Sequence, residues 1–163
     1  MRAEVALRAN QADILAYLVR RVENREDAAD LFGDAYLTAW RKRRSMPADE
    51  EGARRWLFVI ARNTLLNHYS STRRRRAFVA SLRDELRGMD SDPATDQTLE
   101  VREAIASLAP EQAELVRLIH WEGFGVADAG AILGLGASTS RSRYAAARAQ
   151  LQGLLALSVD GGG

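Results

Sequence analysis

Apolar residues recur at helical spacing along most of the chain, and alternation of β-branched with polar residues is nearly absent. This pattern predicts an all-α protein. Two of the three prolines lie where the periodicity breaks, Pro47 within 45–52 and Pro93 within 88–96. Pro110 instead opens an apolar-periodic run, the position that proline favours in the first turn of a helix.

Three helices are expected before residue 80, packed around one core as a first domain over 1–79. The inner face of the first is expected to carry Val5, Ile14, Leu15, Leu18 and Val22. The second begins near Asn24, a candidate N-cap, and its inner residues are Ala28, Leu31, Phe32, Ala35, Tyr36 and Trp40. The third runs from Gly52 or Ala53 to about Arg75 and buries Trp56, Leu57, Ile60 and Leu65. We expect Trp56 to be a core residue rather than a stacking platform.

Apolar spacing fades and acidic residues accumulate over 80–97, as is typical of a flexible linker. A second helical domain is expected over 98–157, followed by a short tail at 158–163. Its first helix carries Leu99, Val101, Ile105 and Leu108, and the next carries Leu115, Val116, Leu118 and Ile119. The sequence therefore predicts two small helical domains joined by a flexible linker.

The end of the second domain has the spacing of a helix-turn-helix. A short helix over 126–133 precedes the turn Gly134-Leu135-Gly136, and Ser138 or Thr139 can cap a helix running to about Leu155. An ordinary helical hairpin with a solvated arginine face is the alternative. His120 and Trp121, just before the motif, are expected to be structural residues of a packed helix end.

In a helix-turn-helix, the first residues of the second helix enter the major groove of DNA. The residues expected there, at base edges and phosphates, are Ser138, Thr139, Arg141, Ser142 and Ala145. Arg143 and Arg148 lie on neighbouring faces and suit phosphate contacts or helix ends better.

Positive charge is concentrated in one segment, although the formal net charge of the chain is only +1. From Ala53 to Arg76 there are seven arginines and no acid, which is typical either of a polyanion-binding surface or of a solvated face. Each phosphate contact steepens the log–log salt dependence of binding by about 0.9. The candidate phosphate contacts are Arg55, Arg62, Arg73, Arg74, Arg75 and Arg76.

Asn63 and Asn67 lie one helical turn apart within this segment. Their amides offer donors and acceptors of the kind that read an exposed base edge. Alternatively, either side chain could cap a helix or bridge within the domain.

Composition excludes several classes of function. The chain has no cysteine and two histidines that are far apart, so neither a zinc site nor another metal or cofactor site is expected. No catalytic triad, phosphate-cradling glycine loop or paired-carboxylate site stands out, so we do not expect an enzyme. The N-terminus does not resemble a signal peptide and no segment is long and apolar enough to span a membrane, which favours a cytoplasmic protein without membrane insertion.

Over nearly its whole length the chain resembles bacterial RNA polymerase sigma factors of the extracytoplasmic-function type, in the sigma-70 family. The segment 56–63 with Asn67 and the basic run is similar to the family's promoter-melting helix, and 27–41 is similar to its polymerase-binding helix. Leu108-Ala-Pro-Glu-Gln with 134–143 and Ala147-Arg148 is similar to its second DNA-binding domain.

The resemblance implies core RNA polymerase and promoter DNA as partners. The first domain would open the minus-ten element and bind the clamp helices of the largest polymerase subunit through Asp27, Asp30, Leu31, Asp34 and Trp40. The second would read the minus-thirty-five element as duplex and contact the polymerase flap. Family members often work under an inhibitory anti-sigma partner, which the flexible linker would permit.

Some positions depart from the family pattern. Gly33 stands where the family usually has a glutamine inside the polymerase-binding helix. The loop 45–52, whose counterpart in the family helps to capture a flipped base, contains no aromatic residue and only Met46 as a large apolar one. In the second domain the departures are Ala129, Gly130, Ser140, Ala145 and Ala146, which predict weaker or different duplex readout. The alternatives to a sigma factor are a stand-alone helix-turn-helix regulator and a sigma-like interaction protein without promoter activity.

Overall fold

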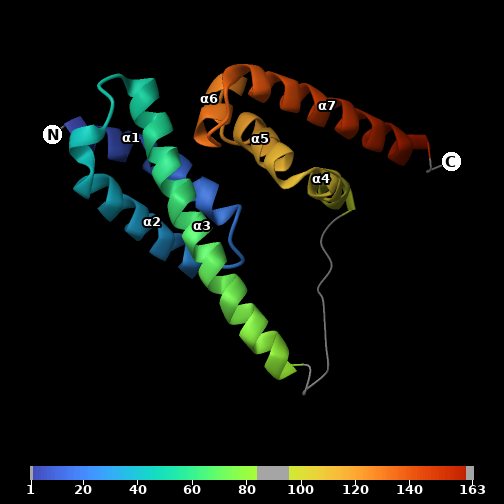
Figure 1. The fold of residues 1–163 in the computed structure, drawn as a ribbon, viewed down its shortest axis with the longest axis horizontal. Helices are drawn as coiled ribbons and strands as arrows, with labels where there is room; N and C mark the ends of the chain where they lie inside the picture. The colour runs from blue at the N-terminus through green and yellow to red at the C-terminus, as the bar shows by residue number, and fades with distance from the viewer. Residues whose placement is uncertain (1, 84–95, 161–163) are drawn as a thin grey trace. The chain divides into compact units, whose positions relative to one another are not determined.

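The computed structural model describes residues 2–83 and 96–160, and gives side chains for 2–74 and 101–155. Within these ranges every regular element is helical, which confirms the predicted all-α class (Figure 1). The chain divides into two compact units, Met1–Met89 and Asp90–Gly163. The finer boundaries expected from the sequence stay a prediction.

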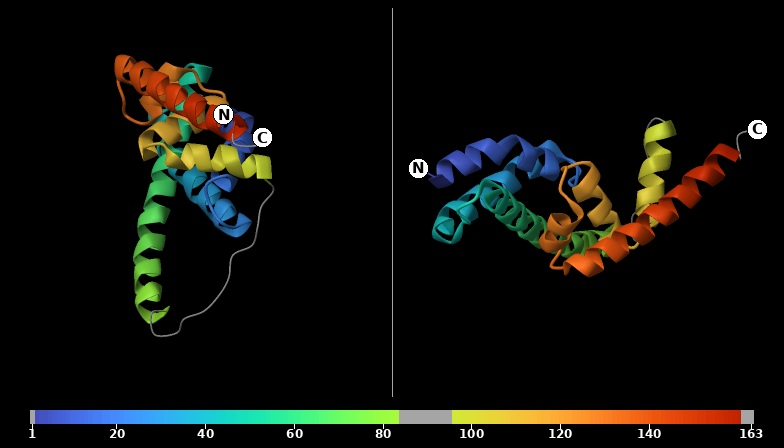
Figure 2. Two further views of the ribbon diagram at one scale, coloured as in Figure 1. Left: turned by 90° about the vertical axis from the view of Figure 1, so that its right-hand side faces the viewer. Right: turned by 90° about the horizontal axis from the view of Figure 1, so that it is seen from above.

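The first unit is a three-helix arrangement of α1 (Arg2–Val19), α2 (Arg25–Arg41) and α3 (Glu50–Arg83), with a short 3-10 turn, η1, over Arg43–Ser45. Each of the three long helices packs on the other two. Figures 1 and 2 show α1 and α2 beside the N-terminal part of α3, whose C-terminal part extends beyond them. The centre of the core is an edge-to-face pair, Tyr17 and Phe58, with ring centroids 5.4 Å apart.

The inner face of α1 differs from the prediction. Val5 is 63% exposed and Leu15 is also exposed, whereas Leu7 and Tyr17 are buried beside the expected Ile14 and Leu18. The buried stripe is Leu7, Asn10, Ile14, Tyr17 and Leu18. This stripe includes a polar residue, because the Asn10 side chain donates to the Ala6 carbonyl at 2.8 Å and so is satisfied within its own helix.

Asn24 is the N-cap of α2, as predicted, and its side chain accepts from the Asp27 N–H at 2.7 Å. Ala28, Leu31 and Ala35 are buried as expected. Trp40, expected in the core, is 38% exposed, and the small Ala39 is buried in its place.

α3 is longer than predicted, because it begins at Glu50 and continues past Arg75 to Arg83. At its start, the Asp49 carboxylate accepts from the Gly52 N–H at 2.6 Å. At its other end, residues 80–83 are Ala, Ser, Leu and Arg, and three of these are strong helix formers. Leu57, Ile60 and Leu65 are buried as expected, and Trp56 is only half-buried.

The second unit contains α4 (Asp96–Ser107), α5 (Pro110–His120), α6 (Val126–Ile132) and α7 (Ala137–Asp160). Pro110 opens α5 as predicted. Ile105, Leu108, Ala113, Val116 and Ala147 form a buried cluster, on which Tyr144 and Leu151 pack. Val101, expected in this core, is 45% exposed, and the side chain of Leu99 lies outside the described residues.

α6 and α7 form the predicted helix-turn-helix pair. Gly134 has a positive φ of 75°, which suits glycine, and the Leu135 N–H donates to the Gly130 carbonyl at 2.8 Å to close the turn. α7 begins at Ala137, so Ser138 and Thr139 lie in its first turn and do not cap it as predicted. The helix extends to Asp160, through residues assigned to the tail, and 161–163 lie outside the described residues.

His120 and Trp121 are both exposed, which contradicts the expected packed helix end. The ring of His120 nevertheless shares a hydrogen bond with the Tyr144 hydroxyl at 2.9 Å. This contact joins the end of α5 to α7.

Candidate nucleic-acid and partner interfaces

Asn63 and Asn67 lie on the solvent-facing side of α3, and both are exposed. Four residues of α-helix place them about 6 Å apart along the axis. Neither amide makes a hydrogen bond within the described part of the chain. Both side chains are therefore available to an external partner rather than used as caps or bridges there.

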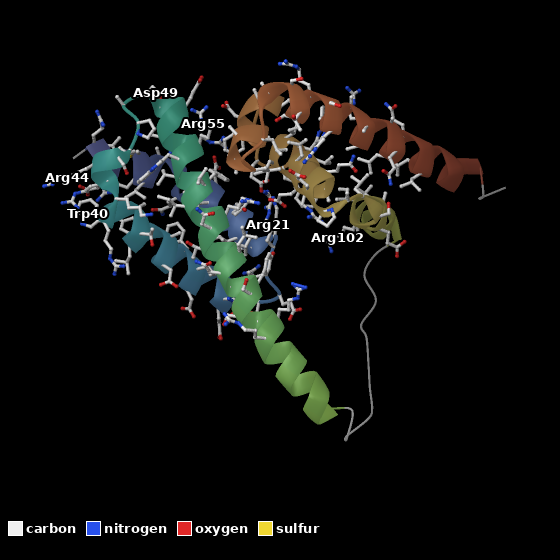
Figure 3. The ribbon with its side chains drawn as sticks, viewed as in Figure 1. Arg21, Trp40, Arg44, Asp49, Arg55 and Arg102 are labelled. Atoms are coloured by element: carbon white, nitrogen blue, oxygen red, sulfur yellow. The ribbon has the colours of Figure 1, made fainter. Side chains whose placement is uncertain are left out.

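The candidate phosphate-contacting arginines differ in their surroundings. Arg73 and Arg74 are exposed, and Arg74 Nε donates to the Ser70 carbonyl at 3.3 Å. Arg55 and Arg62 are half-buried, and Arg55 already interacts within the protein. Figure 3 shows Arg55 near the start of α3. The side chains of Arg75 and Arg76 lie outside the described residues, although the backbone of both is in α3.

A polar groove of about 400 Å³ lies between α2 and α3. It brings together Asn67 and Asp34, which the sequence assigned to different partners. Thr38, Thr64 and Ser71 add hydroxyl groups to its wall. The lining residues are Leu31, Asp34, Leu37, Thr38, Arg41, Thr64, Asn67, His68 and Ser71.

A second hollow, of about 260 Å³, lies where the turn between α1 and α2 meets α3. Asp27 lines it, 3.9 Å from the His68 ring, and accepts from the Asn24 amide at 3.0 Å. The Tyr69 hydroxyl donates to the Arg21 carbonyl at 2.5 Å and joins the turn to α3. Asp27 is therefore hydrogen-bonded to the N-cap residue of its own helix, α2.

The expected polymerase-binding residues differ in their exposure. Asp30 and Asp34 are exposed one turn apart on α2, but Leu31 is only 5% exposed and belongs to the core. Leu37, which the sequence analysis missed, continues the Asp30–Asp34 face and is 51% exposed. Its spacing of seven residues from Asp30 and three from Asp34 was the available signal.

The start of α7 presents an exposed polar face that contains Ser138, Thr139, Arg141, Ser142 and Ala145. Arg143 is instead half-buried and forms an ion pair with Glu111 of α5. Arg148 lies over the Tyr144 ring, 5.8 Å from its centroid. Five of the six predicted residues thus share the open face, and Arg143 helps to join α7 to α5.

The loop over 45–52 carries no exposed large apolar side chain that could capture a flipped base. Met46 is only 6% exposed, and its carbonyl accepts from Arg2 at 3.4 Å. Gly52, at the end of the loop segment, has no room for a Cβ, which would lie 2.7 Å from the Asp49 carboxylate and 2.9 Å from Pro47. The side chains of this loop therefore serve its own packing and the start of α3.

Among the described residues, no group of three His, Cys, Asp or Glu side chains could hold a metal ion. None of the helices there is long and apolar enough to cross a membrane.

Two family models match the chain, Sigma-70 region 2 over residues 6–75 and Sigma-70 region 4 over 98–151. The ECF RNA polymerase sigma factor SigM of Mycobacterium tuberculosis is 34% identical over 142 residues, which cover 86% of this chain and 69% of that protein. The ECF sigma factor SigC of the same species is 31% identical over 147 residues, 89% of this chain and 78% of that protein.

Solved structures show the same fold. The sigma factor RpoE of Bartonella quintana, in complex with the anti-sigma factor NepR, matches with a TM-score of 0.62 and 28% identity, over 93% of this chain and 95% of that one. CnrH, in complex with the cytosolic domain of CnrY, matches with a TM-score of 0.63 and 21% identity, over 95% of this chain and 88% of that one.

Proposed function

Since the chain belongs to the sigma-70 family, as a sigma factor of the extracytoplasmic-function type, it binds core RNA polymerase and directs promoter-specific initiation, and we propose how its residues divide this work. The first unit opens the minus-ten element and the second reads the minus-thirty-five element. The observation that carries the residue assignment is the exposed pair Asn63 and Asn67, whose amides are unengaged within the described residues.

At the minus-ten element, Asn63 and Asn67 contact the edges of unstacked bases. Holding a strand open requires phosphate contacts beside shaped polar surfaces for the bases. Arg62, Arg73 and Arg74 supply phosphate contacts, and Arg55, Arg75 and Arg76 are further candidates for the same role. On the α3 side of the polar groove, Thr64 and Ser71 offer hydroxyl groups to an unstacked base beside Asn67.

Core polymerase docks on the exposed face of α2 that contains Asp30, Asp34 and Leu37. An apolar side chain flanked by carboxylates suits the centre of a docking surface with a polar rim. Leu31 supports this face from the core, because it is buried beneath it. Asp27 acts through the N-terminus of α2, where it is already hydrogen-bonded.

At the minus-thirty-five element, the open face of α7 enters the major groove. Ser138, Thr139, Arg141, Ser142 and Ala145 lie on that face. Arg143, held by Glu111, acts by joining α7 to α5 or by reaching a flanking phosphate.

Four further proposals concern this chain. It has no catalytic activity of its own, in keeping with a family of initiation factors, and it works in the cytoplasm with the bacterial polymerase. An anti-sigma factor regulates it, as the complex with NepR suggests for a structure that is 28% identical over 93% of this chain. The flap of the polymerase is the proposed contact of the second unit.

Run-off transcription with purified core polymerase on a library of genomic promoter fragments tests the proposal. The full chain should co-purify with core enzyme and give discrete transcripts that core enzyme alone does not give. Binding to core enzyme without any specific transcript would indicate a sigma-like interaction protein instead. Duplex binding without polymerase binding would indicate a stand-alone regulator.

A further inference from the structure

The polar groove between α2 and α3 has walls formed by one face of each helix. Asp34, Thr38 and Arg41 lie on the α2 wall, three or four residues apart. Asn67 and Ser71 lie on the α3 wall, with the same spacing. Among the described residues, none of these five side chains takes part in a hydrogen bond or an ion pair. A groove of about 400 Å³ therefore brings together five polar groups that are available to a ligand.

The groove also has an apolar side. Leu31 and Leu37 of α2 line it, the first buried and the second 51% exposed. Its volume lies within the range of small-molecule sites, about 300–1,000 Å³, in which apolar side chains contact the body of the ligand and a few polar groups orient it. The groove therefore suits a flat ring that carries polar atoms on its edges.

The two charged groups of the groove lie two helical turns apart on its α2 wall. Asp34 and Arg41 are separated by seven residues, which is about 10 Å along a helix. Both are exposed, and neither forms an ion pair in the part of the chain that the structure describes. An ionised carboxylate only accepts hydrogen bonds, whereas a guanidinium is a fork of donors that suits a phosphate. A ligand that satisfies both has N–H donors at one end and a phosphate at the other.

A guanine nucleotide has this distribution of groups. The ring N1–H and the exocyclic N2 amine of guanine are adjacent, so one carboxylate can accept from both, and the 5′-phosphate lies at the other end of the molecule. The remaining acceptors of the base, O6 and N7, suit the Asn67 amide and the Ser71 hydroxyl as donors. Adenine has an amine without an adjacent ring N–H, and thymine and uracil have no amine. Asp34 therefore favours guanine over the other bases.

We propose that this groove is a binding site for a free guanine nucleotide, with Asp34 on the N1–H and N2 amine of the base and Arg41 on the phosphate. The bound nucleotide covers Asp34 and Leu37 on the face of α2 assigned to core polymerase, and it occupies Asn67. It therefore competes with the polymerase and with the opened strand, and it inhibits initiation. The site itself depends only on the groove, whereas the inhibition rests on the docking and strand-opening roles proposed above.

Matched ligands test the contact between the base and Asp34. Chemical-shift titration of the full chain with GMP should show saturable shifts in the α2 and α3 amides, with a Kd of roughly 1 mM or tighter. IMP lacks only the N2 amine and should bind about tenfold more weakly, because the carboxylate loses one partner. Asp34→Asn should bring the ratio of the GMP and IMP affinities close to one. Absence of saturable GMP binding, or equal wild-type affinities for GMP and IMP, would overturn the proposal.

Guanosine tests the phosphate contact in the same way. It lacks the phosphate of GMP and should bind the wild type about tenfold more weakly, whereas Arg41→Gln should bind the two ligands with similar affinity. Arg25 and Glu26 are exposed on the first turn of α2 and lie outside the groove, so Arg25→Gln/Glu26→Gln is the matched control. This control should keep both wild-type ratios. If Asp34→Asn and Arg41→Gln kept them too, the nucleotide would bind elsewhere and the proposed site would be wrong.

A guanine within DNA carries the same groups on its base, so oligonucleotides distinguish the two sources of the ligand. Oligo(dT) with one central dG is compared with the same strand carrying deoxyinosine, which lacks the N2 amine. A preference for the dG strand without saturable binding of GMP would assign the groove to DNA and contradict a site for the free nucleotide.

Competition with core polymerase tests the inhibition. At ten times its Kd, GMP should weaken the binding of the full chain to core enzyme about tenfold, and IMP at the same concentration about twofold. Saturable GMP binding with unchanged polymerase affinity would exclude the inhibitory role. A chain that does not bind core polymerase even without GMP contradicts the function proposed above instead, whatever its affinity for the nucleotide.

Discussion

Ser140 on α7 occupies the space in which a Cβ of Gly130 on α6 would lie. A Cβ built on Gly130 would overlap Ser140 Oγ and lie 2.5 Å from Ser140 Cβ. Ser140 is fully buried, and its hydroxyl donates to the Gly136 carbonyl at 2.7 Å. Two departures from the family pattern are therefore one packing arrangement, in which the helices of the motif approach closely at a glycine.

Gly130→Ala should destabilise the second unit. Ser140 Cβ is fixed to its backbone and cannot rotate away, so α6 and α7 must separate, at a cost of about 1–3 kcal/mol. This outweighs the gain of up to about 1 kcal/mol in helix propensity. Hydrogen exchange of the α6 and α7 amides in the full chain should become faster.

Gly153→Ala is the matched control, because a Cβ at this exposed position of α7 meets nothing within 4 Å. It should slow exchange or leave it unchanged. Slower hydrogen exchange in Gly130→Ala as well would contradict the close approach of α6 and α7 at Gly130.

Local signals predicted much of the fold, and long-range contacts explain most of what they missed. The cap at Asn24, the helix start at Pro110 and the turn at Gly134 each depend on residues a few positions apart. The inner face of α1 was predicted with Val5 and Leu15, since periodicity alone leaves the choice between neighbouring stripes to the helices that pack against it.

In the candidate interfaces, too, local signals predicted some features and long-range contacts explain the others. The spacing of four residues predicts that Asn63 and Asn67 share one face of α3. The burial of Leu31 instead depends on the helices around it. Helical spacing placed Arg143 on a different face from Arg141, but its ion pair with Glu111 joins residues 32 positions apart, so no local pattern could have predicted that pair.

Gly33→Ala should stabilise the first unit by about 0.5–1 kcal/mol, because alanine is the better helix former and a Cβ there meets nothing within 4 Å. Urea unfolding of the full chain should show the gain in the transition of the first unit. Core-polymerase affinity, measured in parallel, should stay unchanged if the partner does not approach the Gly33 backbone. A lower stability would contradict the open surroundings of this residue.

Leu31→Ala should mainly lower stability, whereas Leu37→Ala should mainly weaken polymerase binding. The first removes a buried side chain and should cost about 2–5 kcal/mol of unfolding free energy. The second removes an exposed one and should change stability by at most about 0.5 kcal/mol while weakening core-polymerase binding about fivefold or more. Full polymerase affinity of Leu37→Ala would exclude Leu37 from the docking face.

Asn63→Ala and Asn67→Ala should reduce open-complex formation more than the binding of duplex that carries only the upstream element. Each removes an amide that faces solvent on α3, so stability should hardly change. Permanganate reactivity of unpaired thymines reports the opening, on a promoter identified by run-off transcription. Gln11→Ala, an exposed amide on α1, is the control. Equal losses in both assays would remove the two asparagines from strand opening.

Arg141 and Arg143 should differ although they stand two residues apart. Arg141 is exposed at the start of α7, so Arg141→Gln should make the salt dependence of upstream duplex binding shallower by about 0.9, or relax base preference at one position.

Arg143 is held by Glu111, and both side chains of this pair are more than a third exposed, so Arg143→Gln should cost at most about 1 kcal/mol of stability. Glu111→Gln releases Arg143 without removing its charge. If Arg143 only joins the helices, Glu111→Gln and Arg143→Gln will lower stability alike and leave the salt slope unchanged. A slope that becomes shallower in Arg143→Gln but not in Glu111→Gln would instead place Arg143 on a DNA phosphate.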